Sequence, residues 1–393
     1  MLREDFLTYQ AKTTPHPIGL EIKRAKGSYI YDSRGKKYLD FVAGVSACSL
    51  GHRHPAVVRA IRKQINRYLH VMVYGEYAQT PAVELCKTLA ENLPDGLGVT
   101  YLTNSGTEAI EGAMKLAKRV TGREEFIAAK NAYHGSTQGA LSLLGVEQQK
   151  KGYTPLLPKV KFINFNAKDD LVKITDKTAA VVIETIQGGA GFITPEDQYL
   201  EQLKERCESV GALLILDEIQ PGMGRTGKLF AFEHYNITPD ILVIGKGLGG
   251  GMPIGAFSSS SENMEQLTHQ PSLGHITTFG GNPVIAAAGL ATLNTLLKKK
   301  IILEVAEKEA LFRSLLVHPK IKSIRGKGLM LAPILESPEM ANTVVNRALD
   351  KGLILFFLLW EKCAIRISPP LTISKKDIKK GCQIIVDVLN DIP

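Results

Sequence analysis

The chain has 393 residues, of which 48 are Lys or Arg and 39 are Asp or Glu, and 44% of it is hydrophobic. This length suggests two or three domains with a full core, and the composition excludes disordered, collagen-like and disulfide-scaffold proteins. The longest apolar run, residues 353–360, is far shorter than the roughly 20 residues of a membrane-spanning helix. Because the N-terminus also lacks an apolar signal core, we expect a cytoplasmic protein without membrane contact.

The net charge of +9 bears on which kinds of molecule the protein binds. Basic residues are mixed with acids along the chain and form no aromatic-interleaved motif, so we expect no nucleic-acid binding. The positive balance suits anionic small substrates. Five cysteines lie apart without a CxxC pair, and we expect buried free thiols at positions 48, 86, 207, 363 and 382.

We expect three parts along the chain: an N-terminal segment (1–55) packed on the small domain, a large domain (56–302) and a small C-terminal domain (303–393). The first part contains YIYDSRGKKYLDF, which predicts a β-hairpin outside the main sheet. In the last part, LMLAPIL (329–335) and AIRIS (364–368) predict short strands among helices.

Seven short apolar runs in the large part predict strands that are covered on both faces, because they lack polar alternation. They span residues 99–103, 126–130, 160–163, 179–184, 212–218, 240–246 and 254–257. Helical patterns fit at 107–120 and 195–210, and another continues beyond Pro283 through 290–297. The alternation predicts an α/β fold with a parallel, helix-flanked sheet.

The sequence TNSGTEA (103–109) places Ser105, Gly106 and Thr107 where a strand ends and a helix starts. Free backbone N–H groups, the helix dipole and two hydroxyls form an anion site that suits a phosphate. The alternative is an ordinary N-cap, which Ser and Thr commonly provide. Tyr133 and His134 follow the next strand, where an aromatic ring either stacks on a planar cofactor or simply packs.

Asp217 and Lys246 each end a predicted buried strand, at the sheet edge where ligands of open α/β sheets bind. Each alone could be a solvated loop residue. Lys246, however, lies in GKGLGGGMPIG, whose glycines leave room for a ligand against the backbone. A confined lysine loses its proton more easily and can act as a nucleophile or form a Schiff base.

Three other reaction classes are disfavoured. GMGRTGK (222–228) matches most of a phosphate-binding loop, but Leu229 replaces the required hydroxyl and no strand directly precedes it. His52 and His54 lack further ligands at metal-site spacing, so we expect no metal site. The sequence contains no Gly-x-Ser-x-Gly nucleophile elbow.

Taken together, SGTEA, the aromatic-His-Gly turn, DEIQPGMGRTG, GKGLGGGMPIGA and TTFGGNP (277–283) resemble the class III pyridoxal-phosphate aminotransferases. The resemblance runs from about residue 15 to 390, including LDFVAGVSACSLGHRHP and IRISPPLT, and points to the acetylornithine and ornithine branch. It implies fold type I of pyridoxal-phosphate enzymes, with a mostly parallel central sheet and a smaller α+β domain. It further implies a homodimer with shared active sites.

The resemblance also implies residue roles. Lys246 would hold pyridoxal 5'-phosphate as a Schiff base and move protons, and Asp217 would pair with the pyridine nitrogen. Ser105, Gly106 and Thr107 would bind the phosphate, together with Thr278 from a neighbouring subunit. The other positions would be Gln220 at the ring oxygen, Tyr133 on the ring face with His134 beside it, Glu184 near the substrate, and Arg366 at the carboxylate of the oxo acid.

Two departures from that branch concern the substrate. Ser136 and Gly189 stand where those relatives carry an Arg that grips the donor's distal carboxylate and a Glu that masks the oxo-acid arginine. Losing a charged contact costs roughly 1.5–3 kcal/mol, so we expect that N-acetylornithine is not held in the usual way. The expected reaction is ping-pong transfer of an amino group from an amino acid or ω-amine to 2-oxoglutarate.

Other readings remain open at this point. The donor could be 4-aminobutyrate, lysine or a diamine. The same scaffold could instead serve a mutase, racemase or decarboxylase, which would not require an oxo-acid acceptor. A third interpretation is a binding protein without catalytic activity, and only in that case would Lys246→Ala leave the function of the protein unchanged.

Overall fold

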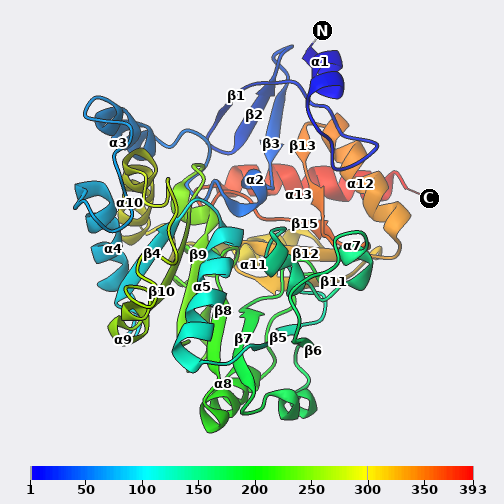
Figure 1. Ribbon diagram of the computed structural model, residues 1–393. Coiled ribbons are helices and arrows are strands. Elements are labelled where there is room, and N and C mark those ends of the chain that lie inside the picture. Colours follow the sequence, from blue (N-terminus) through cyan, green and yellow to red (C-terminus); the bar gives the residue numbers. More distant parts are fainter. Residues whose placement is uncertain (1, 299, 393) are drawn as a thin grey trace.

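One seven-stranded sheet forms the centre of the molecule (Figure 1). The computed structural model describes residues 2–298 and 300–392. In spatial order the strands are β4 (Val99–Thr103), β10 (Gly255–Ser259), β9 (Ile241–Gly245), β8 (Leu213–Asp217), β7 (Thr178–Glu184), β5 (Glu125–Ala129) and β6 (Val160–Ile163). All seven predicted strands are therefore present, within one or two residues of their expected bounds.

The predicted parallel sheet is present, with one strand that runs in the opposite direction. Strand β10 pairs antiparallel with both β4 and β9, whereas β6, β5, β7, β8 and β9 pair in parallel. The chain can return directly from β9 to β10 through a short glycine-rich segment, and such a short connection can join only antiparallel neighbours. The sheet is mostly parallel, as the resemblance implies.

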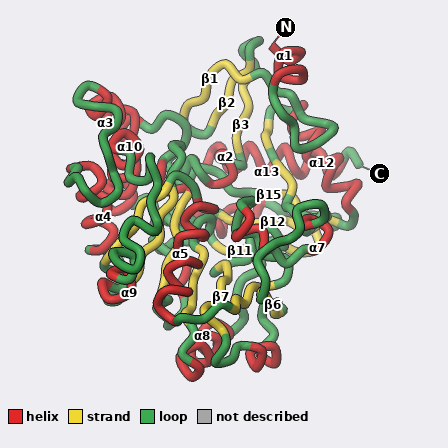
Figure 2. The backbone as a smooth tube through the Cα atoms, in the orientation of Figure 1, coloured by secondary structure: helices red, strands yellow, loops and turns green. Residues whose placement is uncertain are grey.

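Both faces of the sheet are buried, which explains the uninterrupted apolar runs. Along β7, Val181 and Ile183 join one hydrophobic cluster, whereas Ala180 and Val182 join another on the opposite face. Helix α5 (Gly106–Thr121) covers the second face. Helix α8 (Tyr199–Val210) contributes to the first. Figure 2 shows the strands in yellow between helices in red.

The helix bounds follow local signals, with one error in the prediction. Helix α5 ends where Gly122 adopts a left-handed conformation, and α10 spans Pro283–Lys298. Helix α8 begins at Tyr199 and not at Pro195, because Gln198 is left-handed (φ 60°) and interrupts the helical geometry. The backbone N–H of Glu196 instead donates to Asn166 Oδ1 in the preceding loop.

The remaining helical segments of the large part are short or lie beside the central sheet. They are α3 (Pro55–Ile65), α4 (Thr80–Ala90), α6 (Gln138–Ser142), α7 (Glu147–Lys150), α9 (Ser261–Glu265) and the 3-10 turns Lys168–Lys173, Ala231–His234 and Lys246–Gly249. Helix α10 packs against α3 and α4 (Figure 1).

Strands from the N-terminal segment and from the C-terminal part form a second, smaller sheet. After α1 (Leu2–Tyr9), the predicted hairpin is present as β2 (Tyr29–Asp32) and β3 (Lys37–Asp40), with β1 (Ile22–Lys26) beside β2. Strand β3 pairs in parallel with β13 (Leu353–Ile354), so the N-terminal segment and the C-terminal part share one sheet. The short helix α2 (Ala43–Ser46) follows β3.

The C-terminal part mixes strands and helices, as expected. Its elements are α11 (Val305–Leu315), β11 (Ile321–Lys327), β12 (Met330–Leu335), α12 (Pro338–Asp350), β14 (Phe356–Phe357), β15 (Ile365–Arg366) and α13 (Lys375–Asn390). Strand β12 also joins the segment around β15 through isolated bridges.

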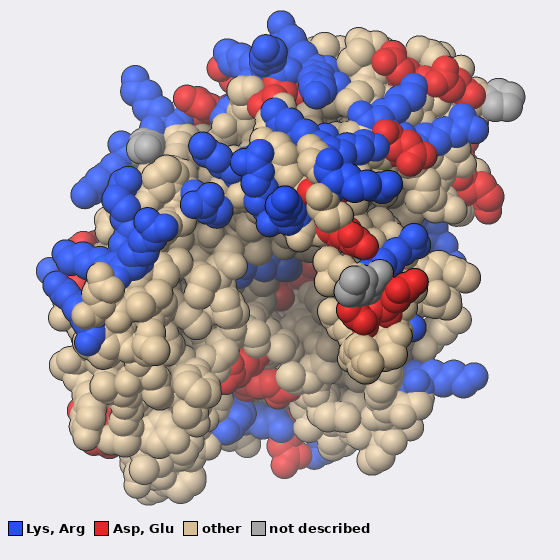
Figure 3. Space-filling model, turned by 90° about the horizontal axis from the view of Figure 1, so that it is seen from above, with Lys and Arg blue, Asp and Glu red and all other residues tan. Residues whose placement is uncertain are grey.

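Exposed basic side chains gather on the N-terminal sheet. Strand β1 contributes Lys23, Arg24 and Lys26, and the hairpin loop contributes Arg34 and Lys36. Figure 3 shows Lys and Arg gathered over much of the face seen from above, which is hollowed near its centre. Such a concentration of charge attracts anionic small molecules.

All five cysteines are free thiols, but the expectation that all are buried holds only for Cys207 and Cys382. Cys48, Cys86 and Cys363 are partly accessible. A search of residues 2–298 and 300–392 finds no helix with the length and apolarity needed to cross a membrane.

Candidate active site

A cavity of about 490 Å³ opens at the carboxyl ends of β7, β8 and β9. It brings together residues from both ends of the sequence. Its lining residues are Val45, Gly106, Thr107, Tyr133, His134, Gly135, Ser136, Glu184, Gly189, Asp217, Ile219, Gln220, Pro221, Lys246, Phe356, Phe357, Leu358, Leu359 and Arg366. Most of the residues singled out from the sequence therefore lie around one space, and Ser105 and Thr278 are the two that do not line it.

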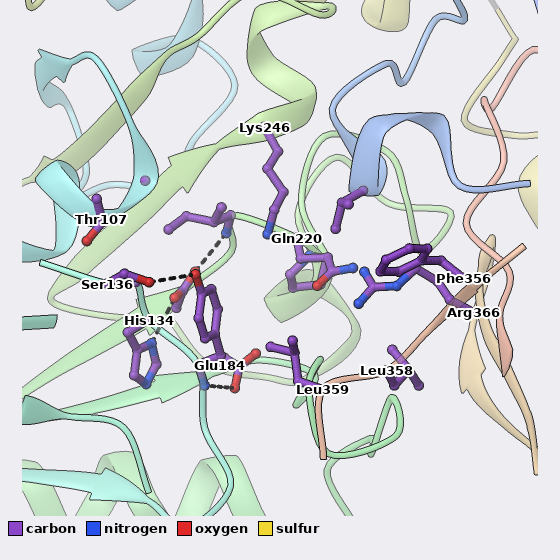
Figure 4. Close-up of a pocket in the computed structure, with 18 of the residues that line it drawn as sticks. Thr107, His134, Ser136, Glu184, Gln220, Lys246, Phe356, Leu358, Leu359 and Arg366 are labelled. Carbon is purple, nitrogen blue, oxygen red and sulfur yellow. Dashed lines mark hydrogen bonds and ion pairs between the residues drawn. The ribbon is translucent and has the colours of Figure 1, made fainter. Parts of the chain in front are cut away.

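Neighbouring strand ends place the ionisable groups of the cavity. Glu184 and Asp217 are register partners at the ends of β7 and β8, and Lys246 follows the last residue of β9 directly. The side chain of Lys246 points into the cavity (Figure 4). Burial lowers the pKa of this amine, against the attraction of Asp217 and with the repulsion of Arg366. A neutral amine, which can act as nucleophile or base, is thereby favoured.

Asp217 is held by two hydrogen bonds. Its Oδ2 lies 2.8 Å from His134 Nδ1, and its Oδ1 accepts from the backbone N–H of Ile219 at 2.9 Å. Burial acts to lower the pKa of His134, but the hydrogen bond to Asp217 and the negative charges of Asp217 and Glu184 together outweigh burial, and the pKa is raised. His134 Nε2 is buried without a partner in the part of the chain that the structure describes. His134 therefore fixes the carboxylate and supports its negative charge.

Glu184 is a second buried acid in the cavity. Its oxygens accept from the backbone N–H groups of Tyr133 (3.1 Å) and Gly188 (2.9 Å). Burial raises its pKa to about 7, although these hydrogen bonds and His134 act in the opposite direction. At neutral pH this carboxyl group can therefore take up or release a proton.

The N-terminus of α5 forms one end of the cavity. Gly106 and Thr107 line it, whereas Ser105 Oγ accepts from the backbone N–H of Glu108 at 3.3 Å and serves as the N-cap. Gly135 (φ 137°) packs so closely on Thr107 that a Cβ atom would clash with its hydroxyl. The free N–H groups of the first helical turn and the Thr107 hydroxyl suit a phosphate.

Two further donors of the cavity lack partners among the described residues. Gln220 Nε2 is one, and Arg366 Nη1 is the other. Arg366 lies at the end of β15, where its Nε donates to the carbonyl oxygen of Phe357 at 3.3 Å. Burial lowers its pKa to about 10, and no carboxylate contributes to its electrostatic environment. A buried guanidinium without an acid is a site for the carboxylate of a small molecule.

The two positions that depart from the acetylornithine pattern differ in their surroundings. Ser136 Oγ lies 3.3 Å from the hydroxyl of Tyr133, so this corner of the cavity is neutral. At Gly189, an added Cβ atom would lie 2.8 Å from Trp360 Nε1. The Trp360 ring therefore occupies the space that any side chain at position 189 would need.

Sequence reasoning missed the apolar side of the cavity. The segment 356–359 contributes two phenylalanines and two leucines, and Val45 of α2 joins them. The signal was visible as the longest apolar run of the chain, which we used only to exclude a membrane helix. That this run lines a cavity depends on the tertiary contacts of its flanking strands. Strand β13 pairs with β3, and the segment around β15 bridges to β12.

Thr278 is exposed and does not reach the cavity of its own chain. It lies next to exposed apolar residues on two segments that contact each other, since the rings of His70 and Phe279 are 4.8 Å apart. The exposed apolar side chains of these segments are Leu69, Val71, Met72, Tyr77, Ile276 and Phe279. We call this surface the 69–279 patch.

The residues present fit pyridoxal 5'-phosphate. The helix N-terminus at Thr107 suits the phosphate, the buried Asp217 suits a protonated pyridine nitrogen, and the Lys246 amine suits the aldehyde. The unpartnered Gln220 Nε2 is available for the ring oxygen. An anion site, a carboxylate and a free amine around one cavity are the contacts that this cofactor requires.

Comparison with known proteins agrees with this chemistry. The sequence profile of the family described as Aminotransferase class-III matches residues 9–389. The acetylornithine aminotransferase of Caldanaerobacter subterraneus subsp. tengcongensis is 38% identical, covering 98% of this chain and 99% of its own. The [LysW]-aminoadipate semialdehyde/glutamate semialdehyde transaminase of Sulfolobus acidocaldarius is 35% identical, covering 93% and 94%.

A solved structure gives the same result for the fold. The ornithine aminotransferase of Toxoplasma gondii ME49 superposes with a TM-score of 0.92 at 30% identity, covering 100% of this chain and 96% of its own. The sequence match and the shared fold extend over nearly the whole chain. The chain belongs to the class III aminotransferases, which are pyridoxal-phosphate-dependent transaminases.

Proposed function

We propose that this enzyme transfers an amino group from an amino acid or ω-amine donor, of the acetylornithine or ornithine kind, to 2-oxoglutarate in two half-reactions. The observation that carries the proposal is that Lys246 and Arg366 line the same cavity. The buried amine acts at the reacting carbon, and the unpartnered guanidinium binds a substrate carboxylate. The names of the relatives support donors of this kind.

The residues of the cavity divide the work. Gly106 and Thr107 would hold the cofactor phosphate, Tyr133 would stack on the ring, and Gln220 would contact the ring oxygen. Asp217, held by His134, would keep the pyridine nitrogen protonated. Pyridoxal phosphate, when bound, supplies an electron sink for the substrate carbon that loses a proton.

Lys246 would hold the aldehyde of the cofactor. Because burial favours the neutral form of this amine, its Nζ can accept a proton inside the cavity and release it again, which is the proton movement that the proposed reaction needs. Glu184, with a pKa raised to about 7, is near enough to Lys246 for its negative charge to stabilise the protonated form of this amine. We propose these roles for the residues that the sequence singled out.

We further propose that the enzyme is a homodimer whose 69–279 patch is covered by a second copy. Contiguous exposed apolar surface of this kind indicates an interface. Thr278 lies beside this patch and would reach the phosphate site of the partner. Light scattering should give a dimer, and Phe279→Glu should shift it towards monomers with weaker cofactor binding; a fully loaded wild-type monomer would contradict the arrangement.

The reaction is tested by the visible absorption of the purified holoenzyme. A donor should bleach the cofactor band, and 2-oxoglutarate alone should then restore it. Candidate donors are ornithine, N-acetylornithine, lysine, 4-aminobutyrate and a diamine. Lys246→Ala should abolish both changes. Turnover of a donor without any oxo acid would instead indicate a mutase, racemase or decarboxylase.

A further inference from the structure

The cavity has two unlike ends. In Figure 4, Thr107 and Ser136 lie on one side, Lys246 and Gln220 in the middle, and Phe356 and Arg366 on the other side. If the cofactor phosphate occupies the Thr107 end, as proposed above, the substrate must extend from Lys246 towards Arg366. The chemistry of that second end therefore determines which donors fit.

Charge at the substrate end is confined to one group. Of the Lys and Arg side chains that line the cavity, Lys246 is committed to the reaction, which leaves Arg366 for a carboxylate. The acids Glu184 and Asp217 already accept two hydrogen bonds each from the protein. A second ammonium group at this end would lie near the Arg366 guanidinium, which repels it and has no acid as an ion-pair partner in the described structure.

The rest of that end is apolar. Phe356 and Leu359 remain 43% and 46% exposed in the described structure, and Leu358 and Val45 lie beside them along the same cavity. Together we call Val45, Phe356, Leu358 and Leu359 the apolar wall. Half-exposed phenylalanine and leucine side chains on a cavity surface gain free energy when a ligand covers them.

The surroundings of Gly189 also keep acidic side chains away from Arg366 and the apolar wall. Because the Trp360 ring fills the space next to Gly189, no acidic side chain can be placed there to pair with Arg366. The backbone N–H of Trp360 donates to the carbonyl oxygen of Gly189 at 2.9 Å, which holds the 356–360 segment against the cavity. Arg366 is therefore always available to a carboxylate, and the wall is always in place beside it.

We infer that the donor carries one carboxylate, bound by Arg366, and an uncharged apolar substituent that lies on the apolar wall. The inference rests on the proposed function for the placement of the cofactor. Donors whose remaining group is a second ammonium, such as unmodified ornithine or lysine, are disfavoured, whereas aryl-bearing, branched or long acylated donors are favoured.

The test uses unreactive carboxylic acids, so that it does not depend on turnover. Binding of propanoate and 3-phenylpropanoate to the cofactor-loaded enzyme is measured by calorimetry. The phenyl compound should bind at least about tenfold more tightly, the gain expected from withdrawing even about two carbon atoms from water. Arg366→Gln should weaken both acids.

Variants separate the wall from general hydrophobicity. Phe356→Ser combined with Leu359→Ser should reduce the preference for 3-phenylpropanoate to less than about threefold, mainly by weakening the binding of the phenyl compound. Both residues are half-exposed, so the fold should tolerate the change. Val172→Ser, at a 72% exposed position outside the cavity, is the matched control and should change neither affinity.

The outcomes distinguish this inference from the proposed function. Equal affinities in the wild type, or a preference that survives the double substitution, would overturn the inference. If the preference is present but no amine bleaches the cofactor, the proposed transamination fails and the apolar site stands. If charged donors such as ornithine turn over at least as well as their acylated, aryl-bearing counterparts, the inference fails although transamination is established.

Discussion

Replacing Arg366 by Met should make the enzyme more stable and less active at the same time. The guanidinium is 4% exposed, it has one hydrogen bond to Phe357, and no carboxylate lies near it in the described structure. Met has a similar length and no charge, so it fills the same space without the cost of burying an unpaired cation.

The magnitude follows from the pKa of Arg366. Burial lowers that pKa from its ordinary value to about 10, which corresponds to about 3 kcal/mol of less favourable solvation of the cation. Loss of the hydrogen bond to Phe357 offsets about 1 kcal/mol of this gain. For a chain of this length, the net change of about 1–2 kcal/mol should raise the melting temperature by about 1–3 °C.

The same change should weaken substrate binding. A charge-assisted hydrogen bond between guanidinium and carboxylate contributes about 1.5–3 kcal/mol, so KM for the oxo acid should rise about ten- to hundredfold. The cofactor band should persist, because Arg366 does not contact the phosphate end. Thermal unfolding of the holoenzyme and steady-state kinetics, compared with Val172→Ser as a surface control, measure both effects.

Two results would refute this reasoning. A fall in melting temperature of several degrees with a retained cofactor band would mean that Arg366 is compensated inside the cavity and stabilises the fold. An unchanged KM would mean that the oxo acid is bound elsewhere. In wild type, the oxo acid should raise the melting temperature of the cofactor-loaded protein, and in Arg366→Met this ligand effect should be lost.

Three further predictions concern other parts of the molecule. Asp217→Asn should lower turnover by about a hundredfold or more and lower the pKa of His134, which NMR of the imidazole would detect; an unchanged pKa would show that Asp217 does not hold the imidazolium. Burial acts to lower the pKa of His52, but its interactions with Asp40 and Cys48 together raise the pKa to about 10. The stability from this pair is therefore complete below about pH 6.5 and lost as the pH rises towards 10, and His52→Gln should flatten that decline in urea unfolding. Ser136→Arg adds a second cation on the Thr107 side of the cavity, so N-acetylornithine can be held there by its carboxylate and not by Arg366, and activity with this donor should increase about tenfold or more; no gain in kcat/KM would count against this second placement.

Local sequence was enough to predict the central sheet. The strands of the central sheet are buried on both faces, so their runs are apolar without alternation, and this pattern is visible without any tertiary information. The carboxyl-end positions of Glu184, Asp217 and Lys246 follow from the same reasoning, since parallel strands end at one edge. The helix start at Ser105, Gly106 and Thr107 was predictable because a Ser-Gly-Thr helix start is a local feature.

Other features depended on parts of the chain that are distant in sequence. The position of β10 between β9 and β4 depends on its pairing with β4, about 150 residues earlier, and no residue within β10 encodes that pairing. The start of α8 depends on the left-handed Gln198, which the helical pattern from Pro195 onwards did not reveal.

The substrate end of the cavity was decided by tertiary structure alone. The amino-acid sequence determined the cofactor, the lysine and the presence of an arginine, because each lies in a short motif whose chemistry is local. The apolar run 353–360 became a cavity wall only because β13 pairs with β3 and the following segment lies over Gly189. Specificity arises where three distant segments meet, and the free energy of such contacts depends on packing that no single segment contains.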